Sequence, residues 1–294
     1  MSTAGSLITK ASRHLLSGTV EERNKLAATV TSSGTTFTLS YDLAGFRPGA
    51  VFEAESELIY VWEAIPATKT LVVERGYAGT TPAAHSSGVV LTLSPRFPRA
   101  QMLDALNFEL DDLSSTANGL YRVVATNLSY NGSDRQIDVT SATNIISLID
   151  VRLRYESDDY PVIHRVRLQR QLPTTDFASG FALVLDDAVM AGTLRITYKA
   201  PFVRASSESS DLQTDCFFPQ TAEDIIEMGL ILRMMSSREI KRTFIESQGD
   251  TRRPDEVPPG ASRDSVANIQ RLRRERIVAE AARLKAQYPT IFRK

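Results

Sequence analysis

Cysteine is almost missing from this sequence. Cys216 is the only one among 294 residues. A lone thiol cannot form an internal disulfide or a cysteine-rich zinc site. We therefore expect Cys216 to be a small, buried, largely apolar side chain. The composition is compatible with a reducing cytoplasm, in which the chain would be made and assembled.

An excess of one charge and a long apolar run are also lacking. The 34 Lys and Arg residues nearly balance the 35 Asp and Glu residues, for a net charge of -1. The chain as a whole is therefore not a binder of polyanions, and any contact with nucleic acid would need a local patch. No stretch reaches the ~18 apolar residues of a membrane span, because even the apolar run 225–235 contains Glu227 and Arg233. The first ten residues lack the basic and apolar regions of a signal peptide, so we expect no membrane contact.

Patterns that mark a metal or cofactor site are scarce. The histidines are His14, His85 and His164. None has a second histidine at metal-ligand spacing, and no His-Glu-x-x-His run occurs. The glycines Gly76 and Gly79 match neither the P-loop spacing nor the dinucleotide-binding spacing. We expect neither a metal nor a cofactor.

Catalytic patterns are scarce as well. No Gly-x-Ser-x-Gly elbow occurs. The paired acids are Asp111-Asp112, Asp158-Asp159 and Asp186-Asp187. Adjacent side chains point in different directions on a helix and on a strand, so such a pair is no catalytic dyad by itself. We predict a non-enzymatic protein without catalytic residues.

Short β segments dominate residues 31–96. Residues 36–40 alternate with period two, and further strand-like runs follow at 51–62, 70–74 and 88–93. The pair Pro48-Gly49 is a strong turn signal. Several short strands in so short a segment predict a small β-barrel-like module.

A second β-rich region covers residues 119–215. Strand-like runs recur there about every dozen residues, with turn pairs such as Asn131-Gly132 between them. Residues 151–155 and 162–168 alternate between apolar and polar residues, which predicts one buried and one solvated face. This rhythm is typical of an antiparallel β-sandwich.

Two helical segments flank this second region and predict a helical core, 97–118 and 219–248. The first contains a helix at 99–113, with one apolar face formed by Met102, Leu103, Leu106, Leu110 and Leu113. The second begins near Thr221, a favourable N-cap residue. With residues 1–30 as an N-terminal arm or helix, the predicted class is α+β: a helical core, the small β module, an inserted β-sandwich and a C-terminal helical arm.

Residues 249–294 combine a proline-rich linker with a basic helix. The linker contains Pro254, Pro258 and Pro259, and the helix is predicted from about residue 262 to 287. From residue 262 onward the basic residues are Arg263, Arg271, Arg273, Arg274, Arg276, Arg283, Lys285, Arg293 and Lys294, against the acids Asp264, Glu275 and Glu280. A solvated amphipathic helix, an arm that binds a partner protein and a DNA contact all fit this pattern. For the partner-binding interpretation the candidate residues are Ile269, Leu272, Arg273, Arg274, Arg276, Ile277, Leu284 and Phe292.

One motif resembles a known family. The run Arg75-Gly-Tyr-Ala-Gly-Thr-Thr-Pro-Ala-Ala-His85, followed by Gly88-Val-Val, is similar to an element of structural proteins of tailed bacteriophages. The segment 95–107 resembles the first helix of phage head-to-tail connector (adaptor) proteins. The resemblance covers about residues 46–113, and beyond them it depends on architecture.

This resemblance implies a structural protein of the virion neck, assembled in the host cytoplasm. It would form a homo-oligomeric ring, a dodecamer, between the portal protein above and a tail or further neck protein below, and it would continue the DNA channel without sequence-specific contact. The large sandwich departs from the smallest connectors, which leaves other tail or collar roles open. A carbohydrate- or receptor-binding sandwich is the other alternative, with Tyr121, Tyr130, Tyr155, Tyr160 and Trp62 as stacking candidates.

Overall fold

The chain folds into two compact units, each assembled from separate stretches of sequence. The computed structural model describes residues 2–16, 20–140, 144–154, 160–186, 189–246 and 261–290. Unit 1 comprises Met1–Glu109, Ala205–Asp215 and Glu223–Arg271; unit 2 comprises Leu110–Arg204, Cys216–Ala222 and Leu272–Lys294. Helices and antiparallel sheets occur together, which confirms the predicted α+β class.

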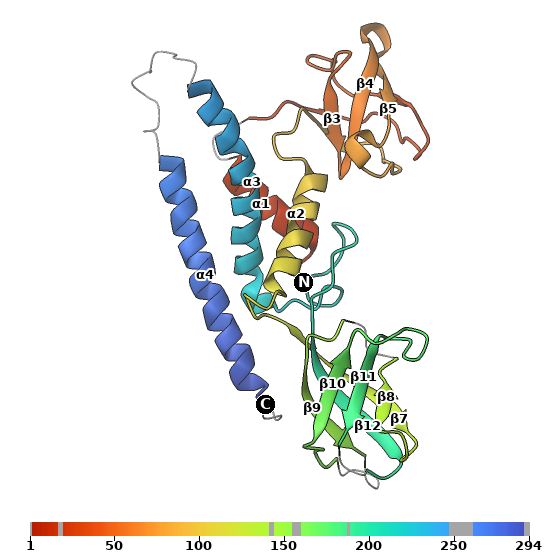
Figure 1. Ribbon diagram of the computed structural model, residues 1–294. Helices are drawn as coiled ribbons and strands as arrows, with labels where there is room; N and C mark the ends of the chain where they lie inside the picture. Colours follow the sequence, from red (N-terminus) through yellow and green to blue (C-terminus); the bar gives the residue numbers. More distant parts are fainter. Residues whose placement is uncertain are drawn as a thin grey trace. The chain divides into compact units, whose positions relative to one another are not determined.

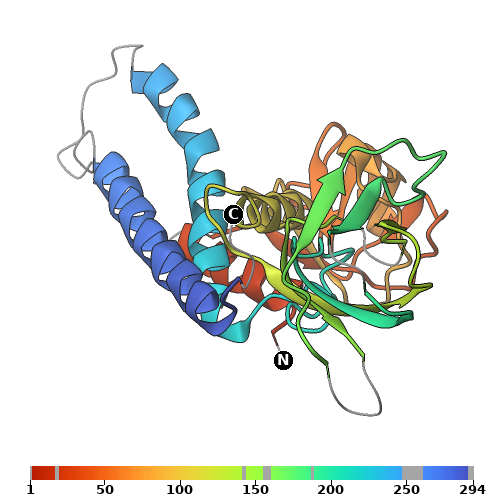
Figure 2. The same ribbon diagram turned by 60° about the horizontal axis from the view of Figure 1, so that its bottom comes forward.

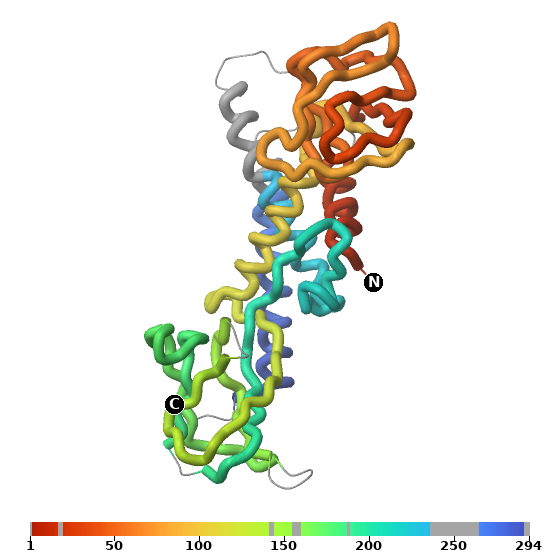
Figure 3. The backbone as a smooth tube through the Cα atoms, turned by 90° about the vertical axis from the view of Figure 1, so that its right-hand side faces the viewer, coloured from red at the N-terminus to blue at the C-terminus, as the bar shows by residue number. Residues whose placement is uncertain are grey.

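Unit 1 contains a curled six-stranded antiparallel sheet, a half-barrel. Its strand order is β1-β6-β3-β4-β5-β2. The strands are β1 (Arg23–Lys25), β2 (Thr36–Thr38), β3 (Val51–Ala54), β4 (Glu57–Ile65), β5 (Thr70–Glu74) and β6 (Val90–Leu93), with the 3-10 turns η1 (Pro66–Thr68) and η2 (Tyr77–Gly79) beside them. The red and orange turns of the tube in Figure 3 follow this curl.

Hydrogen bonds just beyond the two edge strands draw the edges of the half-barrel together. The N–H of Ala27 donates to the carbonyl of Thr38, and the N–H of Ser40 donates to the carbonyl of Lys25, each at 2.8 Å. Joining the edges satisfies backbone groups that an open sheet would leave unpaired. The curled sheet encloses an apolar cluster that includes Phe37, Phe46, Phe52, Ile59, Val61, Leu71 and Leu91.

Unit 1 also contains α1 (Ala4–Leu15), α2 (Arg99–Leu113, in unit 1 as far as Glu109) and α3 (Glu223–Glu246) (Figure 1), together with the start of a fourth helix, residues 261–271. Thr3 caps α1 by accepting a hydrogen bond from the N–H of Ser6 at 3.2 Å. Helix α1 packs against α3, where His14 Nε2 lies 3.4 Å from Glu227 Oε1.

Helices α2 and α3 meet at a glycine. Glu109 on α2 is buried, and its Oε2 accepts a hydrogen bond from Nε of Arg233 at 3.0 Å. A Cβ atom on Gly229 would lie 2.1 Å from the carboxyl carbon of Glu109. Only glycine therefore leaves room for this carboxylate between the helices.

Unit 2 contains two three-stranded antiparallel sheets, ordered β7-β12-β9 and β10-β11-β8. The strands are β7 (Arg122–Tyr130), β8 (Gln136–Asp138), β9 (Ser147–Leu153), β10 (Val166–Arg170), β11 (Phe181–Leu185) and β12 (Gly192–Ala200). Both sheets contribute to one apolar cluster, which includes Leu128, Ile137, Val151, Val166, Leu183 and Ile196. The short turn η3 (Gln220–Ala222) also belongs to this unit.

The last helix, α4 (Ala261–Gln287), is one unbroken rod in Figure 2. Its bounds confirm the helix that the sequence predicts for about 262–287. Its residues from Leu272 onward belong to unit 2. None of the helices that the structure describes is both long and apolar enough to cross a membrane.

Two local predictions are confirmed and a third is confirmed only in part. The helix predicted at 99–113 is confirmed by α2, and Cys216 is buried as expected. The sequence predicts an N-terminal arm or helix over residues 1–30, but α1 ends at Leu15 and residues 23–25 form β1. The reason is pairing: the polar triplet Arg23–Lys25 lies antiparallel to Thr92–Val90 of β6.

Candidate functional site

The predicted partner-binding residues are distributed around α4. Ile277 and Leu284 are buried, Ile269, Arg273 and Arg276 are half-buried, and Leu272 and Arg274 are exposed. Phe292 lies outside the described residues. The structure therefore does not gather the predicted residues on one free face. It separates them into a face that is already packed and a face that meets solvent.

The packed face of α4 is fixed by polar contacts within unit 2. Nη2 of Arg273 donates to Oδ2 of Asp112 at 2.8 Å, and Nη2 of Arg276 donates to the carbonyl of Thr221 at 3.0 Å. Glu280 is buried on this face and accepts hydrogen bonds from Arg283 at 3.0 Å. The spacing 273, 276–277, 280 and 284 follows one side of a helix. These residues hold α4 in place, so they are not available as a whole to a partner.

The opposite side of α4 is exposed and basic. Its solvent-facing residues from 271 to 286 are Arg271, Leu272, Arg274, Glu275, Val278, Ala279, Ala282, Arg283, Lys285 and Ala286. Four of these carry positive charge and one carries negative charge. The alanines between the charged residues, Ala279, Ala282 and Ala286, leave space for a partner surface to approach the helix closely. We call this set the basic face; it suits an acidic, mostly flat partner surface.

The segment Arg75–His85 folds around one buried carboxylate. Glu57 on β4 is only 1% exposed, and it accepts hydrogen bonds from Nε and Nη2 of Arg75, both at 2.7 Å. The backbone N–H groups of Gly76 and Ala83 add two more at 3.0 Å. Nε2 of His85 lies 2.9 Å from Oε2 of Glu57. The start and the end of the motif are thus held by the same side chain.

Arg75 extends this clamp to the other side of the half-barrel. Its Nη1 donates to the carbonyls of Thr31 and Gly34, both at 2.8 Å, and its Nη2 also donates to the carbonyl of Ala83. The planar guanidinium has five N–H donors in a fixed fork, which suits this arrangement of acceptors. The conformation of the loop requires Gly76, whose φ is +64°, and a Cβ there would lie 2.8 Å from the carbonyl oxygen of Thr80.

His85 lies between two carboxylates. It is 1% exposed, and Nδ1 lies 2.8 Å from Oε2 of Glu55 while Nε2 faces Glu57. Both ring nitrogens can donate only in the protonated form. The hydrogen bond to Glu57 raises the pKa of His85 above its ordinary value, against the opposing effect of burial. Burial by itself would raise the pKa of Glu57, but its hydrogen bonds from Arg75, His85 and the backbone outweigh this and lower the pKa to about 2.

The chemistry of this cluster is that of a structural clamp. Both oxygens of Glu57 are occupied by donors that cannot leave without opening the loop, so Glu57 is poorly placed to take a proton from a substrate. His85 is hydrogen-bonded on both ring nitrogens. The sequence alone gives no hint of the clamp, because the acid and the histidine lie far apart in the chain. Glu57 is the first residue of β4 and His85 forms an isolated bridge with Val30, so the fold of the half-barrel brings the two side chains together.

A pocket of about 450 Å³ lies beside the clamp in unit 1. Its lining residues are Glu55, Ser56, Glu57, Thr81, Ala83, Arg99, Ser207, Glu208 and Ser209. Glu208 accepts hydrogen bonds from Nε of Arg99 at 3.0 Å and from the hydroxyl of Ser56 at 2.9 Å. Behind it, burial raises the pKa of Glu53 to about 8, although the backbone N–H of Arg99 donates to this carboxyl at 2.5 Å. Arg99 of α2 and Glu208 thus bind each other, and their further hydrogen bonds to Thr9 of α1 and to Ser56 of the half-barrel join these elements.

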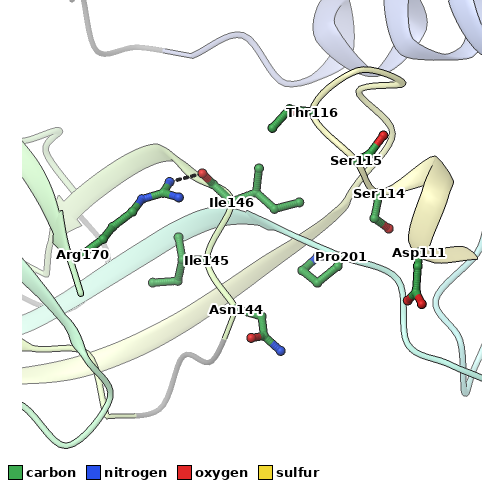
Figure 4. Close-up of a pocket in the computed structure, with 9 residues that line it drawn as sticks. All are labelled: Asp111, Ser114, Ser115, Thr116, Asn144, Ile145, Ile146, Arg170 and Pro201. Carbon is green, nitrogen blue, oxygen red and sulfur yellow. Dashed lines mark hydrogen bonds between the residues drawn. The ribbon is translucent and has the colours of Figure 1, made fainter. Parts of the chain in front are cut away.

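A second pocket, of about 420 Å³, lies in unit 2. Figure 4 shows Asp111 and Arg170 at opposite ends, with Ile145, Ile146 and Pro201 between them. The guanidinium of Arg170 donates to the carbonyl of Ile146, and Asp111 accepts from Nε of Arg204 at 3.0 Å. Each of the two charged groups is therefore already engaged by a partner within the protein.

The stacking candidates proposed for a carbohydrate site do not form one surface. Tyr121 and Tyr130 are buried, Tyr160 is half-buried beneath Arg195, and Tyr155 lies outside the described residues. Trp62 is 60% exposed, but it belongs to the half-barrel and not to the sheets of unit 2. Its ring contacts Tyr60, which in turn stacks on Tyr77, and neither tyrosine is among the stacking candidates predicted from the sequence. The alternation Tyr60-x-Trp62 on one strand was the available signal.

Across the residues that the structure describes, no three His, Cys, Asp or Glu side chains are grouped so as to hold a metal ion. In comparisons with known proteins, no family model matches the chain and no curated protein is significantly similar to it. The function must therefore be inferred from the geometry and from the motif.

Proposed function

We propose that this chain is a structural virion protein of a tailed bacteriophage, a subunit of the head-to-tail connector ring. In this role it joins the portal to the tail and continues the DNA channel. In this proposal the helices of unit 1 act as the core and the half-barrel as the small β module. The two sheets of unit 2 act as an inserted sandwich, and α4 acts as the connecting arm.

The observation that carries the proposal is the basic face of α4. The helix is anchored on one side by Arg273, Ile277 and Leu284, and it offers Arg271, Arg274 and Lys285 on the other. An anchored helix with a free charged side is suited to binding a second protein without paying for its own folding at that moment. An acidic patch on the portal or on a neighbouring subunit is the complementary surface.

The phage-like motif supports the same proposal in a different way. Its arginine and histidine are both buried and engaged with Glu57, so they maintain the shape of the half-barrel. A motif that stabilises the shape of a domain suits an assembly protein, because a ring requires the same rigid subunit at every position.

Oligomeric state is the first test. Native mass spectrometry of the purified chain, alone and with a portal ring, should show a closed ring of roughly twelve copies, since identical head-to-tail contacts close into rings. Quantitative mass spectrometry of virus particles should then give a copy number equal to that of the portal. A protein that stays monomeric with the portal, or that is absent from particles, contradicts the proposal.

The basic face is tested by charge reversal. Arg271→Glu with Arg274→Glu should leave folding unchanged, because both side chains are exposed, and should abolish binding to the portal. The matched control is Arg135→Glu with Arg154→Glu, which makes the same change in charge at exposed positions of unit 2 outside α4. Equal loss of binding in both variants would mean that net charge, and not the basic face, governs the interaction.

A further inference from the structure

The outer surface of the half-barrel carries three aromatic rings in contact. Tyr60 and Trp62 lie on β4 with ring centroids 5.0 Å apart, and Tyr77 on η2 stacks on Tyr60 at 5.5 Å. Trp62, the only tryptophan of the chain, is 60% exposed, and Tyr77 is 39% exposed. We call Tyr60, Trp62 and Tyr77 the aromatic platform.

A β-bulge turns the platform toward solvent. The pairing of β4 with β5 shifts register between Val61 and Glu63, so Trp62 is the extra residue. Val61 points into the core while Trp62 and Glu63 are both exposed. A bulge places two successive side chains outside and re-aims them, which a regular strand cannot do. The exposure of Trp62 is therefore built into the strand.

Acidic side chains accompany the platform. Glu74 of β5 is the cross-strand partner of Tyr60, and Glu63 follows Trp62 directly. Both carboxylates are exposed, and neither is in an ion pair with another residue in the described part of the chain. Exposed aromatic rings beside unpaired acids form a surface for an extended segment that presents proline and arginine together.

This chain contains such a segment. Residues 252–259 read Arg-Arg-Pro-Asp-Glu-Val-Pro-Pro, with Arg252 and Arg253 at one end and Pro258 and Pro259 at the other. Proline restricts the unbound chain, which lowers the entropic cost of binding, and its flat ring stacks on aromatic side chains. Arginine suits carboxylates because it can bind them with two hydrogen bonds.

We propose that the aromatic platform of one copy binds the segment 252–259 of a second copy. Pro258 and Pro259 pack on Trp62 and Tyr77, and Arg252 and Arg253 pair with Glu63 and Glu74. The platform and the segment are different surfaces of the same chain, which is the head-to-tail arrangement that a closed ring requires. The inference rests on the proposed ring and names one of its contacts between subunits.

The single tryptophan makes the experiment selective. In the full chain with Pro258→Ala and Pro259→Ala the platform is vacant, and a peptide of residues 249–261 is titrated while Trp62 emission is followed. The expected result is a saturable shift of the emission to shorter wavelength as the ring leaves water. A peptide with both prolines replaced by alanine should cause no shift. A flat titration with the unaltered peptide overturns the proposal.

Variants of the platform locate the contact. Tyr77→Ala should weaken binding of the peptide about five-fold or more, as the loss of an aromatic contact at an interface does. The control Tyr41→Ala removes an exposed tyrosine of the same unit outside the platform and should leave binding unchanged. Glu63→Gln with Glu74→Gln should weaken binding and reduce its dependence on salt. Equal effects of Tyr77→Ala and Tyr41→Ala would contradict the assignment.

Two further outcomes separate this inference from its premise. One experiment mixes a Trp62→Ala variant with a Pro258→Ala, Pro259→Ala variant and measures ring assembly. If the mixture assembles as well as the unaltered chain, the segment does not bridge copies. The inference is then wrong, although the proposed ring is still supported. If emission of Trp62 in the unaltered chain indicates a covered ring even in a dilute monomer, the segment binds within its own copy, which also overturns the proposal. If the chain forms no ring but the peptide still binds, the proposed connector function is contradicted, whereas the binding of the segment to the aromatic platform is not.

Discussion

Glu57 and Arg75 form a buried, doubly hydrogen-bonded pair, with side-chain exposures of only 1% and 6%. The acid also accepts from the N–H groups of Gly76 and Ala83, and the guanidinium also donates to the carbonyls of Ala83 and Thr31, so neither charge is uncompensated. The loop Arg75–His85 is therefore held by electrostatic contacts from within the half-barrel.

Replacing Glu57 tests this dependence. Glu57→Gln keeps the size of the side chain but leaves Arg75 buried without its counter-charge, and it should lower the free energy of unfolding by about 3 kcal/mol or more. Urea denaturation followed by circular dichroism measures the loss. The matched control Glu63→Gln, an exposed acid on the same strand, should stay within about 0.5 kcal/mol. Equal stability of both variants would contradict the clamp.

The clamp also predicts a specific dependence on pH. The pKa of His85 is raised above its ordinary value of 6.5 by Glu57, so the folded state holds a proton that the unfolded state releases. The stabilising contribution is complete below about pH 6.5 and is lost as the pH rises through the raised pKa. For Glu57 the sign is opposite: its contribution is present above pH 4.5 and is lost as the pH falls toward about 2.

Nuclear magnetic resonance titration of the His85 ring would measure the raised pKa directly. In His85→Gln the decline of stability attributed to the imidazolium above pH 6.5 should disappear, while the decline in acid persists. An unchanged alkaline decline in this variant would mean that another group causes it.

Glu53 is a second group that should make stability fall as the pH rises, and its contribution can be measured separately from that of His85. Burial raises its pKa from 4.5 to about 8, so the folded state retains a proton that the unfolded state loses. Stability should therefore fall as the pH rises between 4.5 and 8. Glu53→Gln mimics the neutral acid, still accepts from the N–H of Arg99, and should remove this decline when unfolding is measured at each pH. A variant that keeps the full pH dependence would show that Glu53 is ionised in the fold.

For Gly229, the direction of the change in stability on substitution by alanine is enough to test the close contact with Glu109. In an unobstructed helix, Gly→Ala stabilises by about 1 kcal/mol. Here the new Cβ would strike the carboxyl group of Glu109, so Gly229→Ala should instead destabilise by about 1 to 3 kcal/mol, the usual cost of overpacking. Thermal denaturation measures the change. In the background Glu109→Ala the obstruction is gone, and the same substitution should become neutral or stabilising.

The elements with a strong local signal could be predicted from the sequence. Helix α2 has the apolar face of Met102, Leu106 and Leu110, with Pro98 in front of it, and its bounds agree with the prediction. Strand β1 has no such signal, since Arg23, Asn24 and Lys25 are polar and become a strand by pairing with β6. Local patterns cannot reveal a pairing partner that lies far along the chain.

The candidate sites show the same limit. The periodicity of α4 identifies its stripe of Ile277 and Leu284, but not that this stripe is buried within the chain while the arginines opposite remain exposed. In the same way, composition cannot separate Tyr121, which is buried, from Trp62, which is exposed. Which side of an amphipathic element meets solvent depends on what the remaining chain supplies.

The discontinuous make-up of unit 2 has a consequence for how the protein is made. Its sheets are encoded before residue 205, but the unit also includes 216–222 and the part of α4 beyond Leu272, where Ile277 and Leu284 are buried. During synthesis, the sheets leave the ribosome long before the helix that belongs to the same unit. Until that helix emerges, the apolar surface that later packs against Ile277 and Leu284 is exposed to water. At about 5–20 residues per second this interval lasts several seconds. A nascent chain of this kind is exposed to premature association, and we expect its yield in cells to respond strongly to chaperones that cover apolar surface on translating ribosomes.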